Sequence, residues 1–409
     1  MKSIFMKLIK LIKQEMVLFV ACVLAVISVF MVPPDREYLG YIDYRVIVLL
    51  FCLMTVMQGF MSTGLFSKMA GLLLSRVKSF RPLMIVLVML CFVCSMWITN
   101  DVALITFVPF TILVLKIAKL ENEMIPIIVL QTIAANLGSM ATPVGNPQNL
   151  YIYSVSNMGI GEFLNEMIPL SLISLLMILA VCFLLKNYEV NIRADLNIDV
   201  NENENANINA NENKPESGIK SGNTGKGALY ENIVLTALFL LSILSVLRIV
   251  SWKILLIAVI LGCVFISILW KEKFLPLKAD FALLLTFAAF FIFIGNMSRV
   301  GYVSNLISKI MAGRELIVSF ACSQVISNVP AAILLSGFTN NYGKLLAGVN
   351  IGGLGTLIAS LASLISFKFF AKQSSINKNV GTKGKFILHF TVLNVAMASV
   401  LIIFDVIIK

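Results

Sequence analysis

The sequence predicts an all-α membrane protein with many transmembrane helices, on three observations. Of its 409 residues, 59% are hydrophobic and only 13% are charged, against roughly 25% charged residues in a soluble domain. The mean hydropathy is +0.94. Apolar runs of about 17–25 residues recur along the chain, and each is long enough to cross a hydrocarbon core of roughly 30 Å as a helix. A soluble globular protein is therefore excluded.

The order of apolar runs predicts nine crossings and two hairpins. Residues 1–14 alternate lysine with apolar residues, which predicts a basic interfacial helix and no cleaved signal peptide. The crossings lie at about 15–33, 43–62, 123–157, 162–185, 229–249, 252–270, 278–296, 342–371 and 384–408. Segments 82–119 and 314–338 are the hairpins. Lys and Arg in the short loops place the N-terminus in the cytoplasm. With nine crossings, we expect the C-terminus outside a cell membrane.

A polar tract divides the chain into two membrane halves. Residues 15–185 predict a first membrane repeat and 252–409 a second, inverted one, with an extra transmembrane helix at 229–251. The Asn-rich stretch 186–228 is too polar to bury a core, which predicts a disordered cytoplasmic linker. A metal-binding or partner-binding tract is the alternative. All seven cysteines lie in apolar runs, so no disulfide framework is expected.

The repeat itself is indicated by polar and glycine residues that match at constant offsets. Thr99-Asn100 matches Ser327-Asn328, 228 residues later. A second set, 214 residues apart, pairs Asn136, Gly138 and Thr142 with Asn350, Gly352 and Thr356. The first span is crossing one and its counterpart is crossing six, so the two halves run in opposite directions. Inverted repeats place a substrate site near the bilayer midplane.

Segment 82–119 is too long for one crossing and is basic at both ends, so it must turn back. The turn is expected at Thr99-Asn100-Asp101, with Ser327-Asn328-Val329-Pro330 as its counterpart. Hairpins that end inside the membrane fit this pattern. Two complete short helices joined by an external turn give the same topology and stay open as an alternative.

Two of the crossings carry helix-breaking residues near their middles. Gly and Pro interrupt 123–157 over residues 138–149, and four glycines between 348 and 355 loosen 342–371. Gly348 and Gly352 also have the spacing of close helix packing, which is the alternative for those two residues. Broken backbone at membrane depth is tolerated only where protein or a water-filled cavity satisfies it. Two turns and two breaks therefore predict a binding site, which we assign to Thr99, Asn100, Asp101, Asn136, Gly138, Thr142, Gly145, Asn146, Asn149, Ser327, Asn328, Asn350, Gly352 and Thr356.

Asp101 lies near the centre of an otherwise apolar segment. A carboxylate there costs roughly 2.5–3.5 kcal/mol even on lenient insertion scales, so such a residue usually has a function. We expect Asp101 to hold a coupling sodium ion or proton, with Asn100 and Asn328 as further sodium ligands. The alternative is a solvated N-cap on a helix that begins at Val102.

With these turns and breaks, the chain resembles the ion transporter superfamily, which includes arsenite permeases, citrate transporters, divalent-anion/sodium symporters and sodium/proton antiporters. The resemblance implies re-entrant hairpins whose Asn-containing tips, together with two unwound helices, hold substrate and coupling cations. Asp101 and Val329 stand where the Ser-Asn-Thr tip of that superfamily has Thr. Neither dicarboxylate specificity nor two equivalent sodium sites is therefore implied.

The function expected from the sequence is secondary active transport of a small anion, a carboxylate or inorganic oxyanion, coupled to sodium or protons. A sodium/proton antiporter and a passive channel are the alternatives. No enzyme is expected, because the single histidine, His389, has no catalytic motif around it, and no Walker motif indicates an ATP-driven pump. We expect no cofactor and no nucleic acid, since the net charge of +11 sits in loops that set orientation. The expected partners are the anion and the bilayer, and a homodimer is left open.

Overall fold

The computed structural model describes residues 16–65, 69, 77, 79–189, 226–270, 276 and 279–408. In this part of the chain the named elements are all helices. The predicted interfacial helix 1–14 and most of the Asn-rich linker lie outside the described residues. The first half contains α2 (Met16–Met31), α3 (Tyr38–Tyr41), α4 (Tyr44–Ser62), α6 (Phe80–Ile98), α7 (Asn100–Ile117), η1 (Glu121–Glu123), α8 (Met124–Ser139), α9 (Pro147–Val155) and α10 (Ile160–Leu184).

The second half follows the same order after one extra helix. It contains α12 (Lys226–Val246), α13 (Trp252–Trp270), α14 (Phe281–Arg299), α15 (Gly301–Met311), α16 (Glu315–Ile326), α17 (Asn328–Ser336), α18 (Tyr342–Ile351), α19 (Leu361–Ile376), η3 (Lys378–Val380) and α20 (Lys383–Ile408). Asp43 and Asp280 are the N-caps of α4 and α14. Each carboxylate accepts from the amide three residues later, Asp43 from Val46 at 3.0 Å and Asp280 from Leu283 at 2.9 Å.

Seven described helices are long and apolar enough to cross a membrane, judged by length and composition. They are α4, α6, α7, α10, α14, the part Leu229–Val246 of α12 and the part Lys383–Ile407 of α20. The apolar parts of α2 and α13 are shorter, at Val17–Met31 and Trp252–Ile268. Large apolar side chains such as Phe30 and Leu184, each 85% exposed, lie on the surface of these helices, as lipid contact requires. The prediction of an all-α polytopic membrane protein is confirmed.

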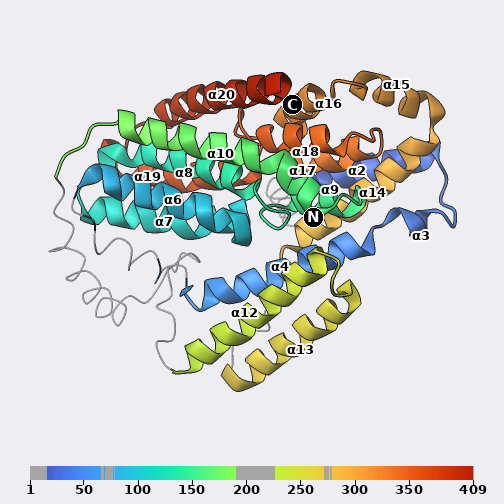
Figure 1. The fold of residues 1–409 in the computed structure, drawn as a ribbon, viewed down its shortest axis with the longest axis horizontal. Coiled ribbons are helices and arrows are strands. Elements are labelled where there is room, and N and C mark those ends of the chain that lie inside the picture. Colours follow the sequence, from blue (N-terminus) through green and yellow to red (C-terminus); the bar gives the residue numbers. More distant parts are fainter. Residues whose placement is uncertain are drawn as a thin grey trace, which may run out of the picture.

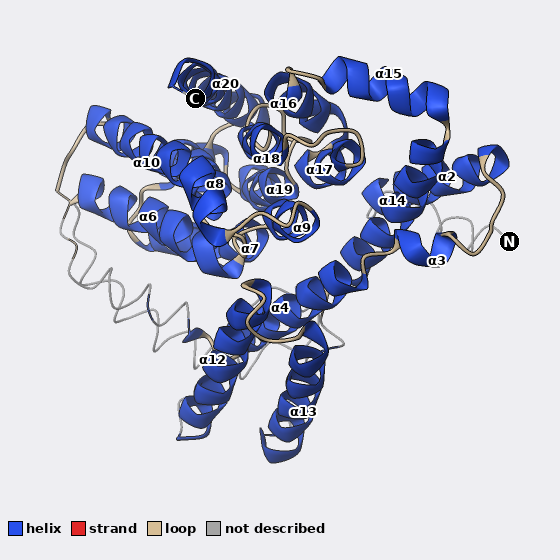
Figure 2. Ribbon diagram, turned by 45° about the vertical axis from the view of Figure 1, so that its right-hand side comes forward, coloured by secondary structure: helices blue, strands red, loops and turns tan. Residues whose placement is uncertain are grey.

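The helices form two groups (Figures 1 and 2). The first, which we call the scaffold group, contains α4 packed against α12 and α13, and α2 packed against α14. The second, the site group, contains α6–α10 and α16–α20. In it α19 packs on α7 and α8, and α20 packs on α8 and α10, so helices of the second half cover those of the first. The groups meet where α4 contacts α9 and α14 contacts α17.

Polar contacts join α2 and α14 at one end of the scaffold group. Arg299 forms ion pairs with Asp35 at 2.7 Å and Glu37 at 3.4 Å. This guanidinium holds the pKa of the Asp35 carboxyl below its usual value. Deeper in, the buried Asn296 amide donates to Ser28 Oγ at 2.9 Å and to the Tyr38 hydroxyl at 2.8 Å. These contacts fix the loop that precedes α4.

An ion pair joins the C-terminal helix α20 to α18 within the site group. Lys344 Nζ lies 2.7 Å from Asp405 Oδ2, and the Asp405 side chain is fully buried. Asp405→Asn should lower the melting temperature in detergent, because it leaves the Lys344 charge without its partner. The accompanying loss in the free energy of unfolding should be smaller than the roughly 3–5 kcal/mol measured when a fully buried ion pair is broken, because 28% of the Lys344 side chain is exposed. The double variant Lys344→Met/Asp405→Leu should recover part of the loss. An unchanged melting temperature in the single variant would contradict this role.

Candidate functional site

The two predicted turns have the same unusual backbone conformation. Thr99 joins α6 to α7 with φ 70° and ψ 151°, and Ser327 joins α16 to α17 with φ 75° and ψ 154°. Positive φ is uncommon outside glycine and costs on the order of 1–3 kcal/mol, so it persists where the surroundings impose it. Asn100 and Asn328, the next residues, are each almost fully buried. Both pairs of helices are therefore hairpins whose tips lie inside the protein.

Both predicted breaks are present. The first helix stops at Ser139 and resumes as α9 at Pro147; the second stops at Ile351 and resumes as α19 at Leu361. The broken helix continues for the nine residues of α9 beyond the first break. The hairpin tip at Thr99, which lies beside that break, is therefore part-way along the broken helix and not at its end.

Each break is held by the hairpin of its own half. The Thr142 hydroxyl donates to the Met96 carbonyl, and the Thr356 hydroxyl donates to the Gln324 carbonyl at 3.2 Å. Met96 and Gln324 each precede a hairpin tip by three residues. Gln324 adds three more bonds, since its amide donates to two carbonyls of the second break and its oxygen accepts from the Thr356 amide.

Glycines allow the broken helices to approach the hairpins closely. A Cβ at Gly138 would lie 2.7 Å from Ser95 Oγ, and a Cβ at Gly352 would lie 2.6 Å from Ser323 Oγ. Gly348 lies within continuous α18, with a Cβ position 1.9 Å from Ser319 Oγ. The expectation that Gly348 loosens the helix is therefore wrong, and the close-packing alternative is right for it.

Asn136, at the end of the first half-helix, contacts three segments. Its oxygen accepts from Asn100 Nδ2 and from Ser360 Oγ, both at 3.0 Å. Its amide donates to the Gly353 carbonyl at 3.3 Å and to Ser363 Oγ at 3.4 Å. Asn136 thus joins its own hairpin tip to the second break.

Asn350 makes the reciprocal contacts in the other direction. Its oxygen accepts from Asn146 Nδ2 at 3.0 Å, and its amide donates to Asn149 Oδ1 at 2.6 Å. Asn146 also caps α9 by accepting from the Asn149 amide at 2.8 Å. Ser360 and Ser363 follow Asn146 and Asn149 by 214 residues, the offset of the repeat. Each half therefore uses an asparagine to hold the second half-helix of the other.

Four helix N-termini meet at one small cavity, which we call the four-termini cavity. Its volume is about 10 Å³, which is room for about one water molecule. Eight of its lining residues are the first residues or caps of α7, α9, α17 and α19, namely Asn100, Asp101, Pro147, Gln148, Asn328, Val329, Ser360 and Leu361; the ninth is Leu283 of α14. Each N-terminus carries a partial charge of about +0.5. The cavity is therefore surrounded by positive helix ends.

Asp101 supplies the only carboxylate among the residues that line this cavity. The helix begins at Asn100 and not at Val102, so Asp101 lies in its first turn and the N-cap alternative is wrong. Asp101 Oδ1 and Gln148 Oε1 are both buried, and neither has a hydrogen-bond partner in the described part of the chain. Two free oxygens thus accompany the four N-termini.

Not every predicted site residue reaches the cavity. Asn136 and Asn350 lie behind it and connect the elements that form it, while Thr142 and Thr356 hold the breaks. Gly145 has a packing role, because a Cβ there would lie 2.0 Å from the Ser139 carbonyl. Four residues were missed, namely Gln148, Gln324, Ser360 and Ser363. The 214-residue offset applied to Asn146 and Asn149 points to both serines.

Comparison with known proteins identifies the family of this chain. The profile of the citrate transporter family matches residues 4–343. The chain belongs to the citrate transporter family. This places it in the ion transporter superfamily, as its turns and breaks predicted, and makes it a multi-pass membrane transporter.

Two relatives of this citrate-transporter family member match most of its length, and a third matches a shorter part. It is 30% identical to an uncharacterised transporter of Methanocaldococcus jannaschii over 81% of this chain and 82% of that protein. It is 26% identical to the inner membrane protein YbiR of Escherichia coli over 83% of each. A silicon efflux transporter of Oryza sativa is 30% identical over 39% of this chain and 33% of that protein.

Asn136 bonds both to the first hairpin tip and to the second break. We therefore expect that replacing it loosens the contact between the two broken helices. Asn136→Ala removes bonds to the first hairpin tip and to the second break, so we expect a lower melting temperature and loss of transport. Asn394→Ala is the matched control, because Asn394 is also fully buried but its amide donates only within its own helix, to the Phe390 carbonyl at 2.7 Å. Equal effects of the two changes on transport per folded molecule would count against a special role for Asn136.

Proposed function

We propose that this transporter is secondary active and carries a small anion, a carboxylate or inorganic oxyanion, through the four-termini cavity. The observation that supports this most is the convergence of α7, α9, α17 and α19. Amides at a helix N-terminus point outward, and the helix dipole favours negative charge there. Four such ends at one point suit an anion of one or two charges.

Asp101 gives a reason for coupling to a cation. A carboxylate and a bound anion in one cavity repel each other, and a proton or a sodium ion on Asp101 removes that repulsion. Anion and cation then bind together and each favours the other. Gln148 Oε1 and the Asn100 and Asn328 side chains line the same cavity and are candidate further sodium ligands. The coupled process is symport of the anion with sodium or protons.

The size of the cavity supports alternating access. About 10 Å³ is too small for a carboxylate or an oxyanion. Binding therefore requires the hairpin tips and half-helices to separate, which exposes the cavity to one side at a time. The family is named for citrate, a carboxylate, which supports a small carboxylate or oxyanion as the solute. We place the protein in the cell membrane with a cytoplasmic N-terminus.

The free oxygens of Asp101 and Gln148 favour a second candidate, a sodium/proton antiporter. In that case no substrate anion binds, and the Asp101 carboxylate itself is the negative charge held by the four N-termini. It would exchange a proton for a sodium ion.

Uptake into proteoliposomes tests the proposal. A panel of radiolabelled carboxylates and inorganic oxyanions is offered under imposed sodium, proton or no gradients. We expect saturable uptake of at least one anion that exceeds equilibrium only when a cation gradient is present. Sodium-driven proton movement without any anion would indicate the antiporter instead, and non-saturable equilibration without a gradient would indicate a channel.

Replacement of Asp101 by Asn tests the coupling role. The change removes the titratable charge but keeps the shape, so we expect gradient-driven accumulation to fall by at least tenfold, or its dependence on sodium or pH to disappear. Glu162→Gln is the matched control. Glu162 is also an acid in the first turn of a helix, α10, but it is exposed and does not line the four-termini cavity. Normal coupled uptake by Asp101→Asn, in protein that folds like the wild type, would refute the role.

A further inference from the structure

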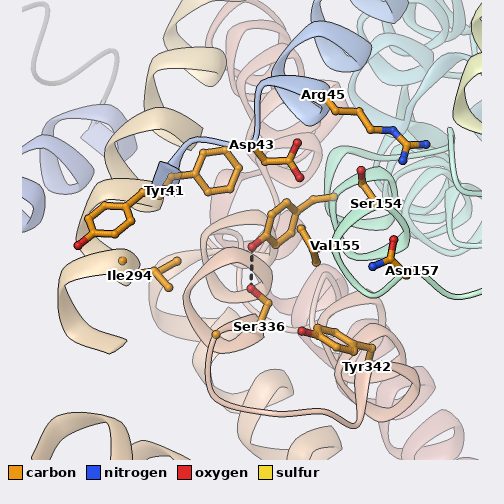
Figure 3. A pocket seen from close by; sticks show the side chains of 13 residues that line it. Tyr41, Asp43, Arg45, Ser154, Val155, Asn157, Ile294, Ser336 and Tyr342 are labelled. Carbon is orange, nitrogen blue, oxygen red and sulfur yellow. Dashed lines mark hydrogen bonds between the residues drawn. The ribbon is translucent and has the colours of Figure 1, made fainter. Parts of the chain in front are cut away.

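A second cavity, which we call the wide cavity, lies between the scaffold group and the site group (Figure 3). Its volume of about 550 Å³ falls within the roughly 300–1,000 Å³ of small-molecule sites. Its polar lining includes Asp43, Arg45, Tyr151, Ser154, Ser336 and Tyr342. Figure 3 shows Asp43 and Arg45 at one side and Ser336 and Tyr342 at the other.

The wide cavity and the four-termini cavity are lined by different parts of the same three helices, α9, α14 and α17. The α9 helix contributes Gln148 to the small cavity and Ser154 to the wide one, six residues or about 9 Å further along. Likewise, α17 lines the small cavity at its first turn and the wide cavity at its end, and α14 lines both. A solute in the wide cavity is therefore a few helical turns from the helix N-termini.

Two residues of the wide-cavity lining, Tyr151 and Ser336, contact each other. The Tyr151 hydroxyl and Ser336 Oγ share a hydrogen bond of 2.7 Å that joins α9 to α17. The Tyr151 ring also packs edge-on against Phe287, with ring centroids 5.9 Å apart. This hydrogen bond and this ring contact hold α9 to α17 and α14 at the wall of the wide cavity.

The charged groups of the wide cavity are not equivalent. Asp43 is engaged as the N-cap of α4, where it accepts from the Val46 amide. Arg248, which lies outside the lining, is engaged with the Tyr153 and Asn157 carbonyls at 3.1 and 3.3 Å. Arg45 forms no hydrogen bond or ion pair with any described residue. The guanidinium of Arg45 is therefore available to a ligand.

Two further observations indicate that the ligand of Arg45 is an anion. The Arg45 charge is repelled by Arg248 and attracted by Asp43. These three side chains carry two positive charges and one negative charge, so an anion beside the arginines relieves the repulsion that Asp43 leaves. Ser154 Oγ, also in the lining, is buried and has no partner among the described residues. A buried hydroxyl without a partner costs stability unless a ligand or water satisfies it. An oxygen-bearing anion can accept from both groups.

We propose that the wide cavity is a recruiting site for the transported anion, with Arg45 as its charge and Ser154 as a hydrogen-bond donor. From there the solute passes between Tyr151 and Ser336 to the four N-termini. That this ligand is the transported solute rests on the proposed anion transport. The positive potential of the cavity does not depend on that proposal.

The potential is measured first, with charged thiol reagents on the full-length protein in lipid nanodiscs. Val155 lines the wide cavity beside Ser154, and Val155→Cys places a thiol there. The ratio of its reaction rates with anionic sulfonatoethyl and cationic trimethylammonioethyl methanethiosulfonate reports the local potential. Adding Arg45→Gln should lower this ratio about fivefold, as expected for loss of one charge several ångströms away. The protein without the added thiol gives the background of the native cysteines.

Arg36→Gln is the matched control, since Arg36 is exposed on the loop before α4 and does not line the wide cavity. It should leave the ratio unchanged, and Arg45→Lys should largely preserve it. An unchanged ratio in Arg45→Gln overturns the inference whether or not the protein carries anions.

Uptake then tests the role of the charge. With an anion that the wild type accumulates, Arg45→Gln should raise KM at least fivefold and leave kcat within twofold, and added salt should reduce the difference. Ser154→Ala should raise KM less. If the wild type accumulates no anion, both the proposed function and the assignment of this ligand fail. If it does and Arg45→Gln has normal KM, only the recruiting role fails.

Discussion

Every backbone group exposed by a broken helix inside a membrane needs a partner, because lipid offers none. Here the partners come largely from the same half, where Asn149 bonds carbonyls of the first break and Gln324 bonds carbonyls of the second. Asn136 and Asn350 add bonds between the halves, to the second break and to the start of α9, so the two broken helices are also tied to each other. The four-termini cavity is the consequence, because the elements tied in this way present their N-termini to one point.

The frame of the site is nearly symmetric, whereas its chemistry is not. The tips at Thr99 and Ser327 share one backbone conformation, and the threonines of both breaks bond to equivalent carbonyls. At the cavity, however, the residue of the second half that corresponds to Asp101 is Val329. Symmetry supplies the positive helix ends in pairs, and this single substitution supplies one negative charge. The cavity therefore has one carboxylate and no equivalent of it in the second half, which differs from two equivalent cation sites.

The sequence predicted the turns and breaks well because each depends on local chemistry that Gly, Pro and Asn reveal. Contacts between the halves depend on packing. The sequence indicated them only where the same residue type occurs at both matching positions of the repeat. Ser360 and Ser363 were missed because serines replace the asparagines of the first half, although the offset was already known. Gly348 was misassigned because a glycine that loosens a helix and one that admits Ser319 look the same in a sequence. Arg45 had no signal at all, since an arginine at a helix start is ordinary.

The position of the two cavities constrains how the protein can move. The wide cavity is bounded by α4 and α14 of the scaffold group on one side and by α9, α17 and α18 of the site group on the other. The four-termini cavity is formed almost wholly by the site group and touches the scaffold only at Leu283. A shift of the site group along α14 would therefore carry the four-termini cavity as a unit and change the wide cavity most. The packing of Tyr151 on Phe287 and Phe291 of α14 lies at this boundary, together with the contacts of α4 with α9 and of α14 with α17, so such a shift has to rearrange those rings.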